Sequence, residues 1–350
     1  MYLKTYPILN NFYHIIYSNT ILIYSRKTNM NKEEVFKDLK HKHYGIFGSH
    51  SAVEICEWNK KALRNEGVCY KQRFYNVDCH RCAQITPAVL WCHQNCVFCW
   101  RPAENMKHPE IKEKLDDPKE IIDGLFKERE KLLSGFFGYH GSNKRLLEES
   151  VIPSHVAISL AGEPTIYPHL PEMIKYLKTK KEIKSIFLVS NGQEPKMFKK
   201  LEKEKALPTQ LYISVSAPDK ETHKKINRPK IKNAWERLLK TMTIVSKLKT
   251  RRVIRFTLIK GLNDNPVYVK KYIKLFEKSN ADFLEVKSYM FLGESRNNLK
   301  IDNMPSFTDV SNYAHLLEKE SKLFKIIDDV PQSRIVLLKN KKSKYNKFIK

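Results

Sequence analysis

Short apolar runs and amphipathic stretches alternate along most of this chain. Runs typical of buried parallel strands occur at 156–160, 186–189, 211–215, 253–259, 283–286 and 335–338. Stretches with helical spacing of apolar residues lie between them, at 118–134, 171–182, 195–205, 233–248 and 266–278. Repeated strand–helix units imply right-handed crossovers and a parallel sheet with its helices outside. The pattern therefore predicts an α/β fold, with an incomplete (β/α)6 barrel of six strands.

Small and polar residues follow several of the predicted strands. Gly162 and Glu163 come after the first run, Asn191 follows the second, and Ser214 lies in the third. The carboxyl ends of barrel strands meet at one end of the barrel, where ligands bind. Gly162 allows a close approach of the backbone, and the Glu163 carboxylate can accept hydrogen bonds from an ammonium group. Such residues also form turns and helix caps, so each indication is weak by itself.

Three of the seven cysteines, Cys92, Cys96 and Cys99, share the run CHQNCVFC. Three thiolates on so short an arc can bind three irons of a 4Fe-4S cube and leave the fourth iron open to a small molecule. Radical enzymes bind S-adenosylmethionine at such an iron. A zinc knuckle is the structural alternative, but zinc usually takes four ligands, and neither nearby histidine completes a familiar zinc spacing. Phe98, before the last of these cysteines, is suited to lie against an adenine ring or to fill the core.

A second set of cysteines, Cys56, Cys69 and Cys82, lies upstream at intervals of thirteen positions. This set could bind a second 4Fe-4S cluster, which would make the chain a two-cluster enzyme. The alternative is that these residues are buried apolar cysteines, because the spacing alone is a weak signal. Cys79 is left over, although it forms a Cys-X-X-Cys pair with Cys82.

The formal charge of +26 and the pI near 9.6 favour a polyanionic partner such as nucleic acid. The alternative is a compositional bias toward lysine, because the basic residues occur all along the chain. Clustered thiols indicate a reducing, cytoplasmic location. Residues 1–29 contain neither a convincing signal peptide nor a stretch long enough to span a bilayer, and we expect a disordered or misassigned extension there. Residues 339–350 are expected to form a flexible basic tail that grips phosphate.

Dense motifs carry a family resemblance that covers roughly residues 50–340. They are Cys69-Tyr-Lys-Gln-Arg-Phe-Tyr75, His80-Arg-Cys82, Thr86-Pro87, Cys96-Val-Phe-Cys-Trp-Arg-Pro102, Ser159-Leu-Ala-Gly-Glu-Pro-Thr165, Leu188-Val-Ser-Asn-Gly192, Ile226-Asn-Arg-Pro229, Trp235-Glu-Arg237 and Gly293-Glu-Ser295. The chain resembles the radical S-adenosylmethionine enzymes that make 4-demethylwyosine in archaeal and eukaryotic phenylalanine tRNA, in their single-domain archaeal form. The resemblance implies that 30–85 carries the auxiliary cluster cysteines and that 86–338 is a radical SAM barrel.

The resemblance also implies a reaction. The cluster of Cys92, Cys96 and Cys99 would cleave S-adenosylmethionine with an electron from an external donor, and the resulting radical would activate the methyl group of N1-methylguanosine-37 in the tRNA(Phe) anticodon stem-loop. That carbon would combine with pyruvate to give the tricyclic base. Pyruvate would chelate the auxiliary cluster or form a Schiff base with Lys71. The alternative interpretation is that Lys71 is an ordinary surface lysine. We expect a monomer, with Arg101 near the reacting base.

Two features depart from the family pattern, namely the extra Cys79 and the sequence Met304-Pro305-Ser306-Phe307, where the family often has a histidine two residues after Met-Pro.

Two rival functions remain. One is a different two-cluster radical SAM enzyme that modifies RNA, such as a methylthiotransferase, although no separate RNA-binding module is evident. The other is a non-catalytic zinc protein that binds RNA. Iron and sulfide analysis would distinguish them.

Overall fold

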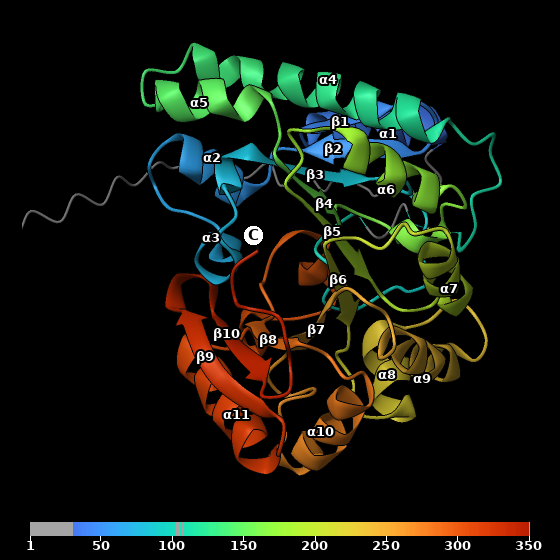
Figure 1. The fold of residues 1–350 in the computed structure, drawn as a ribbon, viewed down its shortest axis with the longest axis vertical. Coiled ribbons are helices and arrows are strands. Elements are labelled where there is room, and N and C mark those ends of the chain that lie inside the picture. Colours follow the sequence, from blue (N-terminus) through green and yellow to red (C-terminus); the bar gives the residue numbers. More distant parts are fainter. Residues whose placement is uncertain (1–30, 103–105, 107, 350) are drawn as a thin grey trace, which may run out of the picture.

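The computed structural model describes residues 31–102, 106 and 108–349. In this part of the chain, ten strands form one curved sheet in the order β1-β2-β3-β4-β5-β6-β7-β8-β10-β9 (Figure 1). The six strands from β3 to β8 are parallel, and the pairs at both edges are antiparallel. The strands are β1 Tyr44–Phe47, β2 Ser51–Glu54, β3 Cys82–Thr86, β4 His155–Ile158, β5 Ser185–Ser190, β6 Gln210–Ser214, β7 Arg251–Leu258, β8 Phe283–Ser288, β9 Phe324–Val330 and β10 Ile335–Asn340.

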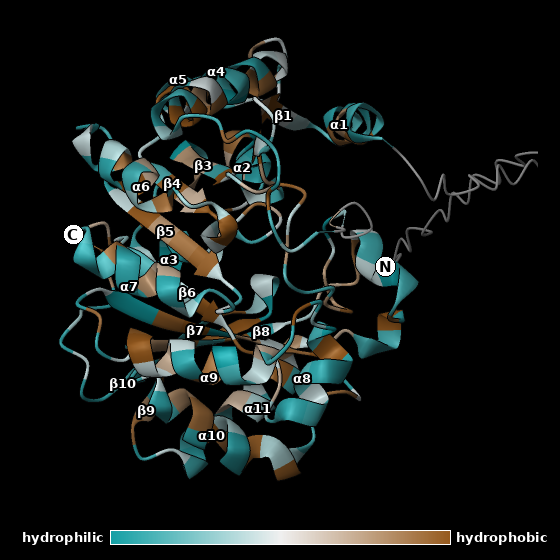
Figure 2. Ribbon diagram, turned by 90° about the vertical axis from the view of Figure 1, so that its right-hand side faces the viewer, coloured by the Kyte–Doolittle hydropathy of each residue, from teal (hydrophilic) through white to brown (hydrophobic). Residues whose placement is uncertain are grey.

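Helices lie around the outer face of this curved sheet (Figure 1). Strand β5 is largely hydrophobic, whereas the helices turn hydrophilic sides outward (Figure 2). Strand residues such as Ile158, Leu188 and Phe256 pack against Leu125 and Met173 from the helices in the largest buried core. The helices are α1 Lys32–His41, α2 Glu57–Leu63, α3 Tyr70–Tyr75, α4 Pro118–Phe137, α5 Lys144–Val151, α6 Leu170–Thr179, α7 Pro195–Lys203, α8 Lys220–Asn227, α9 Ala234–Val245, α10 Val269–Lys278 and α11 Phe307–Glu320.

The predicted incomplete six-stranded barrel is confirmed, but one of its strands was assigned wrongly. The run at 335–338 lies in β10, which is antiparallel to β8, and the first parallel strand is instead β3. Strand β3 reads Cys-Ala-Gln-Ile-Thr, so it has no continuous apolar run to mark it. The domain boundary expected at residue 85 falls inside this strand, because β2 pairs with β3 and joins the N-terminal segment to the barrel sheet.

A second, smaller core fills the inside of the barrel at the end where the strands begin. Phe187, Tyr212 and Phe283 from the strands pack there against Tyr70 and Phe74 from α3. The short helix α3 therefore closes this end of the barrel. Because α3 belongs to the N-terminal segment, residues that precede the barrel also close the end of the barrel where its strands begin.

The C-terminal residues are not a flexible arm, and that expectation was wrong. Lys339 belongs to β10, and the chain beyond it folds back beside α3 (Figure 1). Arg251 donates to the carbonyl oxygens of Asn346 at 2.5 Å and Lys347 at 2.9 Å, and the Ile349 amide donates to the Tyr75 carbonyl at 3.1 Å. The segment thus seals the closed end of the barrel.

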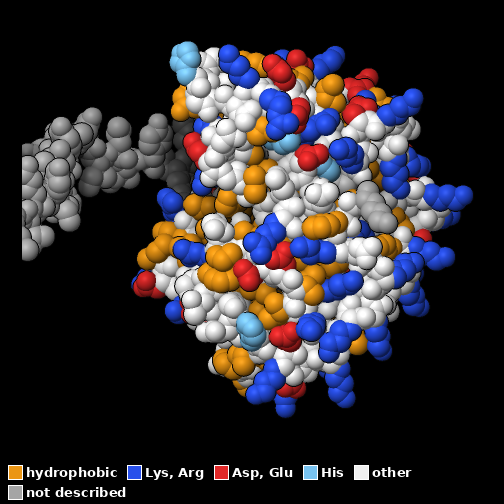
Figure 3. All heavy atoms as spheres, turned by 60° about the vertical axis from the view of Figure 1, so that its left-hand side comes forward, with side chains coloured by type: hydrophobic (Ala, Val, Ile, Leu, Met, Phe, Trp, Pro, Cys, Tyr) orange, Lys and Arg blue, Asp and Glu red, His pale blue; other side chains and the backbone are white. Residues whose placement is uncertain are grey.

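Two other expectations concern the termini and the membrane. The predicted N-terminal extension, residues 1–29, lies outside the described residues. Among the helices that are described, none has both the length and the apolar character needed to cross a membrane. Lysine and arginine side chains are spread over the face shown in Figure 3, with acidic side chains among them, rather than gathered in one block.

Candidate active site

The loop that carries Cys92, Cys96 and Cys99 follows the carboxyl end of β3 and rests on the end of α8. The Asn95 amide donates to the Asn227 carbonyl at 3.1 Å, and the Val97 amide donates to the Ile226 carbonyl at 2.9 Å. The Cys99 amide closes a turn onto the Cys96 carbonyl at 3.0 Å. The segment Ile226-Asn-Arg-Pro229 therefore holds the cysteine loop in place.

Amide side chains contact two of these sulfur atoms. Asn191 Nδ2 lies 3.6 Å from Cys92 Sγ, and Asn227 Nδ2 lies 3.4 Å from Cys96 Sγ. Burial raises the pKa of Cys92 to about 12 and holds that of Cys96 well above its ordinary value. These thiols would stay protonated at neutral pH, so binding a metal would release their protons. Asn227 was not identified from the sequence, because only the fold brings it to the loop.

Three half-buried cysteines, two of them with amide donors at their sulfurs, suit an iron–sulfur cluster, whose properties depend on hydrogen bonds to sulfur. In the described part of the chain, no three His, Cys, Asp or Glu side chains converge as ligands of a single metal ion would. A cube differs in this respect, because each of its thiolates binds a separate iron. The donor set therefore fits the predicted cluster.

Two glycines allow other loops to pack closely on the cysteine loop. At Gly162, where φ is +68°, a Cβ would overlap the carbonyl oxygen of Ala88. At Gly293, where φ is +49°, a Cβ would overlap the carbonyl oxygen of Trp100. L-residues with a side chain rarely adopt such backbone angles. Gly162 thus approaches the backbone of its own chain, beside the cysteine loop.

Glu163 is buried behind the cysteine loop, with an exposed fraction of 2%. Its Oε1 accepts from the Thr165 hydroxyl at 2.5 Å and the Ser190 hydroxyl at 2.8 Å, and its Oε2 accepts from the Asn191 amide at 2.7 Å. A carboxylate has about four acceptor positions. Oε2 therefore has capacity for a further donor.

The other residues predicted to bind the cofactor lie around the same end of the barrel. Phe98 is half-buried and packs against a small core that includes Val97, Ile226 and Tyr289. Ser214 is the last residue of β6 and is half-buried. The strand ends thus bring Gly162, Glu163, Asn191 and Ser214 to the end of the barrel that carries the cysteine loop.

Arg101 has a structural position that differs from the one expected. Its side chain is buried, forms an ion pair with Glu54 of β2 and donates to the Tyr44 hydroxyl at 2.8 Å. The guanidinium also lies over the Trp100 ring, 3.7 Å from its centroid. Arg101 therefore ties the cysteine loop to the N-terminal strands, and the expectation that it would lie near the reacting base has no support in these contacts.

The upstream cysteines lie at the opposite end of β3. Cys82 is the first residue of this strand, and Cys56 and Cys69 cap the N-termini of α2 and α3. Burial raises the pKa of Cys56 to about 11 and that of Cys82 to about 12, and each of these thiols interacts electrostatically with Cys69. The structure therefore brings the three predicted auxiliary ligands together. Cys79 is buried beside them and interacts with Cys56 and Cys69.

Lys71 points into the barrel from α3. Its Nζ lies 4.6 Å from the centroid of the Phe187 ring and 5.6 Å from that of Tyr212. Both rings belong to the inner core, so the amine lies within the barrel rather than on the surface. The alternative of a mere surface lysine does not hold for this residue.

The inside of the barrel also carries charged residues, and the sequence did not reveal the buried Glu285 or its ion pair with Arg255. Glu285 is fully buried and accepts from three tyrosine hydroxyls, those of Tyr70, Tyr75 and Tyr212, at 2.7–3.1 Å. Arg255 Nη2 lies 3.1 Å from Glu285 Oε2. Two residues further along β8, Lys287 donates to the Ser333 carbonyl at 2.9 Å, and burial lowers its pKa to about 8.

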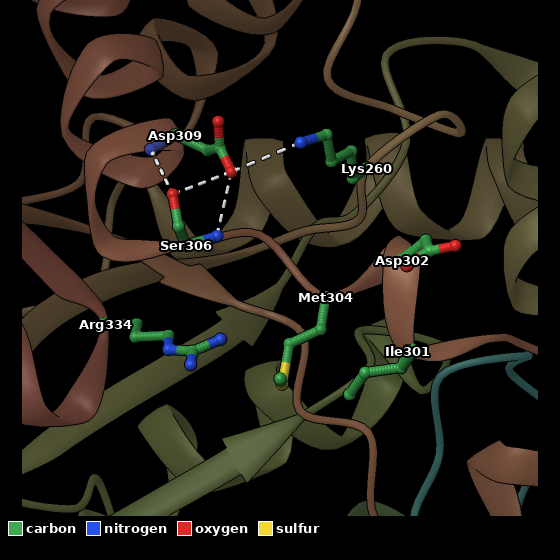
Figure 4. Close-up of a pocket in the computed structure, with 7 residues that line it drawn as sticks. All are labelled: Lys260, Ile301, Asp302, Met304, Ser306, Asp309 and Arg334. Atoms are coloured by element: carbon green, nitrogen blue, oxygen red, sulfur yellow. Dashed lines mark hydrogen bonds and ion pairs between the residues drawn. The ribbon is translucent and has the colours of Figure 1, made fainter.

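Two cavities lie near the open end of the barrel. One, of about 470 Å³, is shown in Figure 4 and is lined by Lys260, Ile301, Asp302, Met304, Ser306, Asp309 and Arg334. None of the residues predicted to bind a cluster or cofactor lines it. Ser306 caps α11 there, and Phe307, which replaces the histidine common in the family, is the first residue of that helix. The other cavity, of about 620 Å³, is lined in part by His93, beside Cys92, and by Thr165.

Comparisons with known proteins agree with this arrangement. The radical SAM superfamily matches residues 87–269, and the wyosine base formation family matches 278–340. The S-adenosyl-L-methionine-dependent tRNA 4-demethylwyosine synthase of Pyrococcus horikoshii is 43% identical over 306 residues, which are 87% of this chain and 88% of the relative. The synthase of Methanocaldococcus jannaschii is 39% identical over 90% of this chain and 98% of its own length.

A solved structure of TYW1 with a lysine–pyruvate adduct bound is 37% identical, with a TM-score of 0.80, and covers 91% of this chain and all of that one. A crystal structure of archaeal TYW1 is 34% identical, with a TM-score of 0.74 and the same coverage. Radical SAM membership implies S-adenosylmethionine and a 4Fe-4S cluster as cofactors. The sequence similarity, the fold and the cysteine loop together show that this chain belongs to the radical SAM family of tRNA 4-demethylwyosine synthases.

Proposed function

We propose that this chain condenses N1-methylguanosine-37 of tRNA(Phe) with pyruvate to form 4-demethylwyosine. The observation that carries the proposal is the arrangement of the barrel interior, where two sets of three cysteines lie at opposite ends of β3 and the amine of Lys71 points inward over Phe187 and Tyr212. A methylthiotransferase or a zinc-dependent RNA-binding protein would not require an amine in this place.

Cys92, Cys96 and Cys99 would hold the cluster that binds S-adenosylmethionine, and Asn191 and Asn227 would donate to its sulfur ligands. When bound, this group supplies a 5′-deoxyadenosyl radical, which abstracts a hydrogen atom. Glu163 would accept from the ammonium group of the cofactor through its less occupied Oε2. The remaining contacts would come from residues of neighbouring strand ends, namely Phe98, Gly162, Asn191 and Ser214.

Cys56, Cys69 and Cys82 would hold a second 4Fe-4S cluster, so that the loaded enzyme contains two. Their mutual proximity, the burial of all three thiols and the position of Lys71 two residues after Cys69 support this assignment. Cys79 interacts electrostatically with Cys56 and Cys69, and a variant can test whether it acts as a ligand.

Lys71 would hold pyruvate as an imine. Its Nζ would attack the keto carbon and expel water, so that the carbon–oxygen double bond is exchanged for a carbon–nitrogen double bond. No hydrogen bond or ion pair holds this amine within the described residues, where it lies over two aromatic rings. The lysine–pyruvate adduct in the related TYW1 structure supports the same chemistry.

Lys287 would bind the carboxylate of pyruvate. It lies inside the barrel, interacts electrostatically with Cys69, and uses one donor on the Ser333 carbonyl. The charge of Arg255 is balanced by Glu285, whereas no ion pair joins Lys287 to an acidic residue in the described part of the chain. A buried cation favours an anionic partner, and the pyruvate carboxylate would provide it.

The strong positive charge supports binding of the tRNA anticodon stem-loop through its phosphates. We expect the enzyme to act as a monomer in the cytoplasm and to receive its electrons from an external donor. Phosphate contacts position an RNA, whereas the reacting base must be read at the open end of the barrel.

Iron and sulfide analysis after anaerobic reconstitution tests the two-cluster assignment. About eight irons per chain are expected for two cubes and about four for one. Cys96→Ala should abolish the production of 5′-deoxyadenosine, whereas Cys69→Ala should abolish the tricyclic product and leave some cleavage of S-adenosylmethionine. Cys79→Ala is the matched control, a buried cysteine in the same region that should retain both activities. Normal product from Cys69→Ala would show that the upstream set is structural.

Borohydride reduction in the presence of pyruvate tests the role of Lys71. The wild-type chain should gain a covalent adduct that peptide mass spectrometry places at Lys71, and Lys71→Arg should gain none there. An adduct of equal yield at another lysine would overturn the assignment of this residue.

A further inference from the structure

Arg129 has the largest side chain among the fully buried residues of the described chain, with an exposed fraction of 0%. It lies on α4, and its guanidinium reaches inward to the turn that precedes β3. Burial lowers the pKa of Arg129 to about 10, so the side chain still carries its positive charge at neutral pH. The charge is therefore held away from water.

Only carbonyl oxygens accept hydrogen bonds from this guanidinium. Nη1 donates to Ser150 at 2.5 Å, Nη2 to His80 at 3.3 Å and Nε to Cys82 at 3.4 Å. No ion pair connects Arg129 with a carboxylate among the residues that the structure describes. Carbonyl dipoles satisfy the donors, but they do not cancel a full charge, and burying an uncompensated ion is costly.

Three other arginines with buried or half-buried side chains illustrate the difference. Arg101 pairs with Glu54, and Arg255 pairs with Glu285. Arg251 also donates only to uncharged oxygens, but it lies at the closed end of the barrel and interacts with Asp282. For Arg129, the groups that can balance the charge are Cys82 and Cys56, whose sulfurs become negative when they bind a metal.

We propose that Arg129 is the countercharge of the auxiliary cluster held by Cys56, Cys69 and Cys82, and that it raises the reduction potential of that cluster; this inference rests on the proposed function. Three thiolates outweigh the positive charge of a cubane core, so the loaded site is anionic, and reduction makes it more so. A fixed cation nearby stabilises both states, and the reduced state more strongly.

A second consequence concerns metal loading. Without iron, Arg129 is a buried charge that lacks its partner, and in the loaded protein it has one. Arg129 therefore opposes folding of the metal-free chain and favours the loaded chain. A residue that merely ties the backbone at 80, 82 and 150 together would contribute equally in both states.

The test uses a full-length host in which Cys92, Cys96 and Cys99 are alanine, so that only the upstream set can load. The potential of the remaining cluster is measured by redox titration followed by electron paramagnetic resonance. Arg129→Met should shift the reduction potential to a more negative value, whereas Arg129→Lys should keep a potential close to that of the triple-alanine protein. Arg251→Met is the matched control and should leave the potential unchanged. A fully loaded Arg129→Met with an unchanged potential would overturn the inference.

Denaturant unfolding of the metal-free and loaded forms provides the second measurement. Arg129→Met should leave the midpoint of the metal-free form unchanged or raise it, and should lower the midpoint of the loaded form. Equal losses in both forms would show that Arg129 is only a backbone tie. The inference is also supported if folded Arg129→Met cannot retain iron but Arg129→Lys can. It is contradicted if neither variant retains iron. Iron analysis of the triple-alanine protein shows whether the upstream cysteines bind a cluster at all. If they bind none, the auxiliary site of the proposed function is wrong.

Discussion

The buried carboxylate of Glu285 offers a sharp test of how the inside of the barrel is organised. We predict that Glu285→Gln lowers the free energy of unfolding by about 3–5 kcal/mol, the usual cost of removing one partner of a buried ion pair. The side chain is fully buried, and it accepts from Tyr70, Tyr75, Tyr212 and Arg255. The substitution keeps the size of the side chain but removes its charge.

The magnitude follows from the contacts. Oε1 accepts from Tyr75 at 2.7 Å and Tyr212 at 3.1 Å, and Oε2 accepts from Tyr70 and Arg255, both at 3.1 Å. The glutamine amide nitrogen must replace one of these oxygens, so at least two acceptor contacts are lost. Each hydrogen bond to a charged group contributes about 1.5–3 kcal/mol, so the loss of two gives a cost similar to that of breaking the ion pair.

Denaturant unfolding of Glu285→Gln, Arg255→Met and the double variant would measure the effect. Because the two residues share one ion pair, the double variant should lose about 2 kcal/mol less than the sum of the single variants. Asp282→Asn is the matched control, since Asp282, directly before β8, pairs with Arg252 of β7 and bonds to Ser343 rather than to the inner tyrosines. Both variants should be less stable, but only Glu285→Gln should reduce trapping of pyruvate at Lys71, which lies over Tyr212.

Additive losses within about 0.5 kcal/mol would refute the reasoning, because they would mean that the two charges do not depend on each other. A cost below about 1 kcal/mol for Glu285→Gln would refute it as well, since a solvated carboxylate would behave in that way.

Three further predictions concern other parts of the chain. Ending the chain after Lys344 should lower the melting temperature and the yield of the pyruvate adduct, because Arg251 loses two carbonyl acceptors and α3 loses its hydrogen bond from the Ile349 amide. The salt dependence of tRNA binding should not change. Gly162→Ala should cost about 1–3 kcal/mol in denaturant unfolding and reduce iron retention, because φ is +68° there, whereas Gly135→Ala, with open space around it, should cost nothing. If basic side chains contact Z phosphates, log affinity for tRNA should fall with log salt at a slope between about −0.7Z and −0.9Z, and tight binding that is insensitive to salt would indicate that the +26 charge is compositional.

Much of the barrel could be predicted because parallel strands buried on both faces leave continuous apolar runs in the sequence. The run at 186–189 lies within β5, the run at 211–215 extends across the end of β6, and the run at 283–286 lies within β8. The direction of a strand leaves no such mark, so the run of β10 was read as parallel. Strand β3 was missed because Gln84 and Thr86 interrupt its apolar residues.

The candidate site shows the same division. Cys92, Cys96 and Cys99 were found because one loop carries all three, and the ligand spacing is therefore written in the chain. Lys71 had a motif beside it, but only the packing of α3 under the barrel shows that its amine points inward. Residues that act through distant partners, such as Arg129 and Glu285, left no local pattern.

The sequence by itself determined the chemistry of this protein, namely two sets of thiols, a lysine beside one of them and an alternation of strands and helices, because thiol spacing and apolar periodicity are local properties. Only the tertiary structure decided where the charges lie. The C-terminal lysines look like a mobile arm in the sequence, yet Arg251 and α3 hold that segment against the barrel. Compensation between buried charges depends on which distant residues the fold brings together, and a linear pattern does not record it.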